Sequence, residues 1–233
     1  MTELPKVSIP EFEEWGVNAF TTTRDAGNFS LAGAEAVGEV MSRWSALQDE
    51  IGGSAPRLAT VRQVHGNRVV QFGGGWRGWL RDGKADGQIT LEKGTALATT
   101  VADCVPVFIA HPSGGVALLH SGWRGTVARI TEAALAQFTA LGMQPSDLAV
   151  HLGPAICGRC YEVSADVRGQ LTGETANRAG NVDLRSLIAG HARSAGVKRI
   201  TVSEYCTRCD NDRLFSHRAA DAGRQIGVIF ARC

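Results

Sequence analysis

Two histidines and a cysteine, His65, Cys104 and His120, each lie where a strand-like segment meets a turn containing glycine or proline. Two imidazoles and a thiolate form a borderline-soft donor set that suits zinc, and three protein ligands leave one tetrahedral position open for water or substrate. Zinc sites with an open position are usually catalytic. Because the three residues are far apart in the chain, their spacing alone also allows each to be a separate structural residue.

Two Cys-x-x-Cys pairs, Cys157 with Cys160 and Cys206 with Cys209, form a second group of candidate metal ligands. Paired cysteines are typical of a structural four-cysteine zinc site, although these pairs lie further apart than in a compact zinc ribbon. A reducing cytosol favours free thiols or a redox-active pair over such a site. A zinc-stabilised binding module without catalysis is therefore the non-enzymatic alternative.

The composition favours small-molecule chemistry. The chain has 233 residues, of which 44% are hydrophobic, so it can bury a substantial core as one domain over residues 1–233. Its 24 lysines and arginines balance 23 aspartates and glutamates, so neither nucleic acid nor a membrane surface is an expected partner. The first residues lack the pattern of a secretory signal, and no apolar run reaches membrane-spanning length, which predicts a cytoplasmic protein.

Hydrophobic patterning predicts a mixed α/β protein. Residues 73–78 formally match the dinucleotide pattern G-x-G-x-x-G, but no helical periodicity follows, so residues 73–87 are expected to form a surface loop. Strands are expected at 17–23, 58–72, 96–110, 116–120, 148–152, 199–203 and 226–230, and helices at 34–47, 126–141 and 183–194.

Nine short segments resemble one family in their order along the chain. The chain is similar to the laccase-domain or polyphenol-oxidase family, also described as multifunctional purine nucleoside phosphorylases and peptidoglycan-editing-factor-like proteins. The resemblance implies an α/β/β/α sandwich with mixed sheets, like that of cysteine hydrolases of the deamidating-toxin type. It also implies that His65, Cys104 and His120 bind Zn²⁺, with Cu²⁺ able to occupy the same donors. The segments are residues 63–66, 85–87, 102–107, 120–125, 153–156, 160–163, 206–207, 214–218 and 223–229.

The resemblance implies a zinc-dependent purine nucleoside phosphorylase with adenosine deaminase and methylthioadenosine phosphorylase activity, acting on a purine nucleoside and phosphate. Copper-dependent polyphenol oxidation is one alternative, although six histidines are too few for a blue-copper laccase. A second alternative is a hydrolase of peptidoglycan precursors, in which Cys104 is the nucleophile and His120 its base. The oligomeric state is left open.

Further polar residues near the three candidate ligands suggest roles in catalysis. Phosphate needs planar cationic donors, and Arg124 is the first candidate, followed by Arg62 and Arg24. Asp103 is expected to orient a metal-binding imidazole, because such a histidine usually donates its second N–H to an acceptor.

Two positions depart from the family pattern. Ser121 replaces the usual alanine before Gly-Trp-Arg-Gly, and His217 replaces a tyrosine, which is expected to alter the rim of the pocket.

Overall fold

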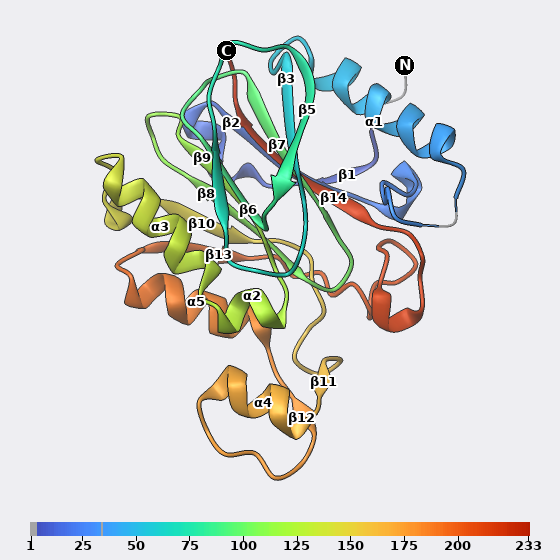
Figure 1. The fold of residues 1–233 in the computed structure, drawn as a ribbon, viewed down its shortest axis with the longest axis vertical. Helices are drawn as coiled ribbons and strands as arrows, with labels where there is room; N and C mark the ends of the chain where they lie inside the picture. The colour runs from blue at the N-terminus through green and yellow to red at the C-terminus, as the bar shows by residue number, and fades with distance from the viewer. Residues whose placement is uncertain (1–3, 34) are drawn as a thin grey trace.

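The computed structural model describes residues 4–33 and 35–233. Two mixed six-stranded sheets form the body of the molecule (Figure 1). The first has the order β1 (Lys6–Ser8), β2 (Val17–Thr22), β14 (Gln225–Ala231), β7 (Thr95–Val101), β3 (Arg57–Arg62), β5 (Gly78–Lys84). The second has the order β13 (Arg199–Val202), β10 (Ala149–Leu152), β8 (Val105–Ala110), β9 (Val116–Ser121), β6 (Gly87–Thr90), β4 (Val69–Phe72).

Helices cover the outer faces of both sheets. The α-helices are α1 (Val37–Ile51), α2 (Trp123–Val127), α3 (Ile130–Ala140), α4 (Ala165–Thr172) and α5 (Leu184–Ser194). Short 3-10 helices span Pro10–Trp15, Arg24–Ala26, Pro145–Asp147 and His217–Ala219, and β11 (Glu162–Val163) pairs with β12 (Gly180–Asn181). Within the described residues, no helix is both long enough and apolar enough to cross a membrane.

Three apolar cores hold the layers together. Helix α1 buries Trp44 and Leu47 against the first sheet, and α3 and α5 bury Phe138 and Ile188 against the second. The core between the sheets includes Phe108 from β8 and side chains from both inner faces. The layers therefore follow the order helix, sheet, sheet, helix, and the predicted mixed α/β fold is confirmed.

Several predicted element boundaries differ from the structure. The prediction of a loop over residues 73–87 is wrong, because β5 pairs in parallel with β3 at a sheet edge. Its side chains are mostly exposed and show no alternation, so backbone pairing rather than burial defines this strand. The predicted helix 126–141 is interrupted at Arg129, which has a φ of 60°. The predicted helix 34–47 corresponds to α1, although residue 34 lies outside the described residues.

Two predicted strands are each divided between the sheets. Residues 58–72 form β3 in the first sheet and β4 in the second, and residues 96–110 form β7 and β8 in the same way. Strands β3, β5 and β7 are parallel, so the connections 63–68, 85–86 and 102–104 cross between sheets at one end of the sandwich. Strand β9 also ends there, because Ser121 pairs with Val105 at the start of β8. This end of the molecule therefore gathers four loop segments that are distant in sequence.

Candidate metal centre and substrate pockets

The structure brings His65, Cys104 and His120 together at this end of the sandwich. His65 and Cys104 lie in two of the crossing connections, and His120 is the penultimate residue of β9. One potential ligand atom from each residue lies within 4.8 Å of the other two. The two imidazole rings are 4.8 Å apart and inclined by 78°. The three residues selected from sequence thus form one compact donor group.

Asp86, in the third crossing connection, positions both histidines. Its carboxylate accepts a 2.8 Å hydrogen bond from Nδ1 of His120, which leaves Nε2 of that ring available to a metal. The same carboxylate accepts the backbone N–H groups of His65 and Gly66 at 2.9 and 2.7 Å. Sequence reasoning missed Asp86, although it is the central residue of segment 85–87, one of the segments that carry the family resemblance.

Asp103 does not contact an imidazole, so the prediction that it orients one is wrong. Its side chain accepts hydrogen bonds from the hydroxyls of Thr207 and Ser216 at 2.6 and 2.8 Å, and from the backbone N–H of Arg218 at 2.7 Å. Three donors occupy this carboxylate away from both rings. Asp103 therefore ties the turn that carries Cys104 to two later segments of the chain.

Backbone geometry at the centre is tightly constrained. His65 and Asp103 have positive φ values of 60° and 80°, which are uncommon outside glycine and concentrate at functional sites. A Cβ at Gly122 would lie 2.7 Å from Sγ of Cys104 and 3.5 Å from Cδ2 of His65. The lack of a side chain at Gly122 permits this close approach of the turn between β9 and α2 to the thiol. The donor set, its spacing and the absence of a side chain at residue 122 therefore fit a metal ion of zinc's size and preference.

The charges of the metal-free centre favour a thiolate on Cys104 and a protonated imidazole on His120, whose proton a metal must displace. Burial raises the pKa of the Cys104 thiol, but the charge of His120 and hydrogen bonds from both histidines lower it to about 6. Burial lowers the pKa of His120, whereas the Cys104 thiolate and Asp86 raise it to about 9. In the metal-free protein the two residues therefore form a thiolate–imidazolium pair at neutral pH. Burial also raises the pKa of Asp86, but hydrogen bonds from His120 and the backbone leave it lowered overall.

Two pockets meet at the centre. The larger has a volume of about 760 Å³, and the smaller has a volume of about 280 Å³. Both are lined by His65, Ala102, Cys104 and His217. The smaller pocket is also lined by Arg124, Tyr161 and Arg218. Two of the three donors, His65 and Cys104, thus form a shared wall between the larger pocket and a pocket with two guanidinium groups, and His120 faces the larger pocket.

The arginines predicted from sequence have different positions. Arg124 lines the smaller pocket and stacks 4.3 Å over the ring of Trp123. Arg218, which sequence reasoning did not select, lines the same pocket and stacks 4.8 Å over Tyr161. Arg24 instead donates hydrogen bonds to the Asp221 carboxylate at 2.7 Å and to two backbone carbonyls. Its guanidinium therefore has a structural role.

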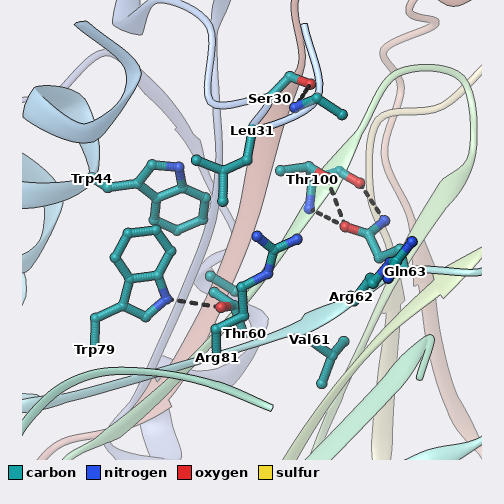
Figure 2. Close-up of a pocket in the computed structure, with 12 residues that line it drawn as sticks. Ser30, Leu31, Trp44, Thr60, Val61, Arg62, Gln63, Trp79, Arg81 and Thr100 are labelled. Carbon is teal, nitrogen blue, oxygen red and sulfur yellow. Dashed lines mark hydrogen bonds between the residues drawn. The ribbon is translucent and has the colours of Figure 1, made fainter. Parts of the chain in front are cut away.

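Arg62 lines a third pocket of about 230 Å³, away from the donor group (Figure 2). Figure 2 shows Trp44 and Trp79 stacked on one side, with ring centroids 4.7 Å apart. On the other side, Gln63 accepts hydrogen bonds from the backbone N–H and hydroxyl of Thr100 at 3.1 and 2.6 Å. Because Gln63 and Thr100 also line the larger pocket, the third pocket extends it towards α1.

The two departures from the family pattern affect different places. Ser121 is buried, and its hydroxyl pairs with that of Thr126 at 3.0 Å, so it lies behind the pocket wall. His217 is exposed and lines both pockets, as expected for a residue at the rim.

The two Cys-x-x-Cys pairs also meet in space. The sulfur atoms of Cys157, Cys160, Cys206 and Cys209 all lie within 4.8 Å of one another. Among the residues that the structure describes, these four and the His65 group are the two clusters of three or more His, Cys, Asp or Glu side chains able to hold a metal.

Comparison with known proteins places this geometry in a family. The family model described as multi-copper polyphenol oxidoreductase laccase matches residues 16–232. A purine nucleoside phosphorylase of Mycobacterium tuberculosis is 36% identical over 92% of each chain. A purine nucleoside phosphorylase of Streptomyces coelicolor is 32% identical over 83% of each chain. An adenosine deaminase from an unknown prokaryotic organism is 29% identical over 100% of each chain.

Solved structures agree with the fold. The crystal structure of YlmD from Geobacillus stearothermophilus has a TM-score of 0.90 and 28% identity, covering 100% of this chain and 98% of that one. The hypothetical protein YfiH of Bacillus licheniformis has a TM-score of 0.88 and 24% identity, covering 98% and 97%. Because the family model spans nearly the whole sequence and the relatives extend across most of it, this chain belongs to the multi-copper polyphenol oxidoreductase laccase family.

Proposed function

We propose that this chain is a zinc-dependent purine nucleoside phosphorylase that also deaminates adenosine and phosphorolyses methylthioadenosine. The observation that carries the proposal is the clustering of His65, Cys104 and His120 where two pockets meet. His65 and Cys104 line both pockets, and the smaller one also holds Arg124 and Arg218. The names of the Mycobacterium and Streptomyces relatives and of the adenosine deaminase support the purine nucleoside as substrate.

In this proposal, His65, Cys104 and His120 would hold zinc, which would supply a Lewis acid beside the pockets. Asp86 holds the Nδ1 proton of His120, which leaves Nε2 of that ring as the nitrogen that would bind a metal. Asp103 positions Cys104 by accepting hydrogen bonds from Thr207 and from residues 216 and 218, which hold the turn that contains both residues. The chain thereby presents its donors with little reorganisation.

The nucleoside would occupy the larger pocket and phosphate the smaller one. A volume of about 760 Å³ is within the usual range of small-molecule pockets. In phosphorolysis a phosphate oxygen forms a bond to C1′ of the ribose while the C1′–N bond breaks, and the purine leaves with the electron pair and takes up a proton. Arg124 would bind and orient the incoming phosphate through paired N–H donors, with Arg218 beside it.

A specific observation supports a second candidate, a cysteine hydrolase acting on peptidoglycan precursors. The pKa of Cys104 falls to about 6 beside His120, which is the activation that a thiolate nucleophile with an imidazole partner requires. A kinship of the sandwich with cysteine hydrolases of the deamidating-toxin type would agree with this chemistry. Copper-dependent polyphenol oxidation, which the family name suggests, would have to use the same two-imidazole donor set.

We further propose that residues 1–233 act as one domain in the reducing cytoplasm. All six cysteines are free thiols in the structure, which agrees with a compartment that keeps thiols reduced.

The deciding experiment is a chromatographic assay of the zinc-loaded protein with adenosine, inosine and methylthioadenosine, each with and without phosphate. Cys104→Ala is the test variant, and Cys233→Ala, at the exposed terminus, is the matched control. Phosphate-dependent release of free base that Cys104→Ala abolishes and Cys233→Ala retains is the expected result. Phosphate-independent inosine from adenosine would show deamination alone. No turnover of any nucleoside by the zinc-loaded protein would exclude the proposal and favour the hydrolase.

A further inference from the structure

Four cysteines converge beyond the carboxyl ends of β10 and β13, because these two adjacent strands end side by side. Strands β10 and β13 are parallel neighbours, so the segments that follow them leave the same edge of the sheet. Cys157 and Cys160 lie in the first segment, and Cys206 and Cys209 lie in the second. Ala155 and Cys206 form an isolated β-bridge that holds the two segments together.

The sulfur positions match a tetrahedral thiolate site. Zinc binds thiolate sulfur at about 2.3 Å, which places the sulfur atoms of a four-cysteine site about 3.8 Å apart. The four sulfur atoms lie within 4.8 Å of one another, and those of Cys160 and Cys209 are 3.5 Å apart. All four residues are free thiols, so no disulfide accounts for the grouping. An iron–sulfur cluster, whose thiolates bind different iron atoms, requires a wider arrangement.

Backbone and side-chain hydrogen bonds hold the cysteine segments in place. The N–H groups of Cys157 and Cys209 both point to Sγ of Cys206, at 3.2 and 3.4 Å. Asn181 holds the turn between Cys157 and Cys160, because its side-chain amide donates hydrogen bonds to the carbonyls of Gly158 and Arg159 at 2.8 Å each. These contacts fix the position of the Cys206 sulfur and the path of the turn that carries Cys157 and Cys160.

We propose that Cys157, Cys160, Cys206 and Cys209 bind one zinc ion in a closed four-sulfur site, distinct from the His65 centre, that fixes a wall of the smaller pocket. Because sulfur fills all four positions, the site has no place for substrate and its role is structural.

The cysteines act on the pocket through their neighbours. Tyr161, next to Cys160, lines the smaller pocket beneath Arg218. Thr207, next to Cys206, donates a 2.6 Å hydrogen bond to Asp103, which immediately precedes Cys104. An ion that joins the two segments therefore holds both the aromatic wall and the support of Cys104. In this sense the cysteines are positioning residues.

Metal content tests the site directly. We expect about two zinc ions per chain in the wild type by mass spectrometry of the purified protein, and about one in either Cys209→Ser or Cys104→Ala. Cys233→Ser is the matched control and should retain both. One zinc per wild-type chain that is lost completely in Cys104→Ala would overturn the proposal.

X-ray absorption of zinc in Cys104→Ala provides a readout that does not need a cysteine variant of the four-sulfur site. We expect a shell of four sulfur atoms at about 2.3 Å. A mixed nitrogen and oxygen shell, iron in place of zinc, or a Cys157–Cys160 or Cys206–Cys209 disulfide detected by peptide mapping would each overturn the proposal. Neither readout depends on nucleoside turnover, so failure of the proposed activity would leave the test intact.

Hydrogen exchange tests the consequence for the pocket. In Cys209→Ser, the segments 154–161 and 203–210 should exchange faster than in the wild type, while β8 and β9 keep their protection. Unchanged exchange in both segments would show that no ion joins them.

Discussion

Asp86 and His120 are joined by a 2.8 Å hydrogen bond from Nδ1 of the imidazole to a carboxylate oxygen, and both side chains are buried. The same carboxylate accepts the backbone N–H of His65, so one side chain sets the position of two of the three proposed metal ligands. Asp86 itself comes from a third connection between the sheets. The centre is therefore organised by a residue that is not itself one of its three proposed ligands.

Asp86→Asn should weaken zinc binding by about 10- to 100-fold, which is the usual cost of removing a partner of a metal-binding histidine. The amide cannot accept all the hydrogen bonds that the carboxylate accepts, so the Nδ1 proton of His120 loses its fixed acceptor. Competition with a chromophoric chelator measures the affinity. Asp49→Asn, on the exposed face of α1, is the control and should bind zinc as the wild type does. Equal affinity in Asp86→Asn would show that this carboxylate does not position the ring.

Gly122→Ala should abolish metal binding at the His65 centre, because the new Cβ would lie 2.7 Å from Sγ of Cys104. Metal analysis and thermal unfolding report the result. Gly190→Ala is matched to it, since its Cβ would meet open space within α5, and the change should be neutral or stabilise by about 0.5–1 kcal/mol. Full zinc content in Gly122→Ala would mean that the loop can relax without cost to the site.

Alkylation of Cys104 in the metal-free protein should be half-maximal near pH 6, because its pKa falls to about 6. An ordinary thiol reaches this point near its pKa of about 8.5. Iodoacetamide labelling followed by peptide mapping separates Cys104 from the other cysteines. In His120→Ala the midpoint should move up by at least about one unit, since the cation that favours the thiolate is gone. An alkylation midpoint near pH 8.5 for Cys104 in the wild-type protein would contradict the pairing of its thiolate with His120.

Asp221→Asn should destabilise the fold by about 1–2 kcal/mol at neutral pH, because the carboxylate accepts hydrogen bonds from Arg24, Asn211 and the N–H of Ser216. Partial burial raises the pKa of Asp221, but these hydrogen bonds leave it lowered overall. Its contribution is therefore present above the unfolded pKa of about 3.9 and disappears as the pH falls through the lower folded value.

Urea unfolding at pH 7 and at successively lower pH values checks this dependence. The difference between wild type and Asp221→Asn should shrink only below about pH 4. Asp212→Asn, an exposed neighbour, serves as the control. If the difference in free energy of unfolding stayed constant down to the lowest pH, the ionised form of Asp221 would not be the cause of the destabilisation.

Arg124→Ala should raise the KM for phosphate by about 10-fold or more in the proposed phosphorolysis, since a charged hydrogen-bond pair is lost. Deamination of adenosine, which needs no phosphate, should change much less. Arg193→Ala, at the exposed end of α5, is the matched control. Equal losses of both activities in Arg124→Ala would indicate a structural defect instead of a phosphate contact.

The sequence allowed the donor group and the fold class to be predicted, but not the routes of the chain between sheets. Metal-capable side chains beside turns, together with the family resemblance, selected His65, Cys104 and His120. The structure places the first two in connections between the sheets and His120 near the end of β9. The change of sheet within 96–110 was hidden because its connection spans only residues 102–104 between two apolar runs. Within 58–72 the polar connection 63–68 was included in one β-rich segment, because the apolar residues on both sides have similar strand propensity.

The hidden routes of the chain also explain why Asp103, and not Asp86, was predicted from sequence to orient an imidazole. Both aspartates are adjacent to turns, and only the three-dimensional crossing of β5 to β6 brings Asp86 under the imidazole of His120. Asp103 was chosen because it neighbours Cys104 in sequence, whereas its carboxylate is occupied by residues more than a hundred positions later.

The three crossing connections have a thermodynamic consequence. No single sheet contains the complete donor set, so an ion that binds all three residues recognises only the state in which the sheets are docked. By mass action, such a ligand stabilises the docked state against every partly opened form. The rate of zinc release from the His65 centre should therefore report how often the two sheets separate.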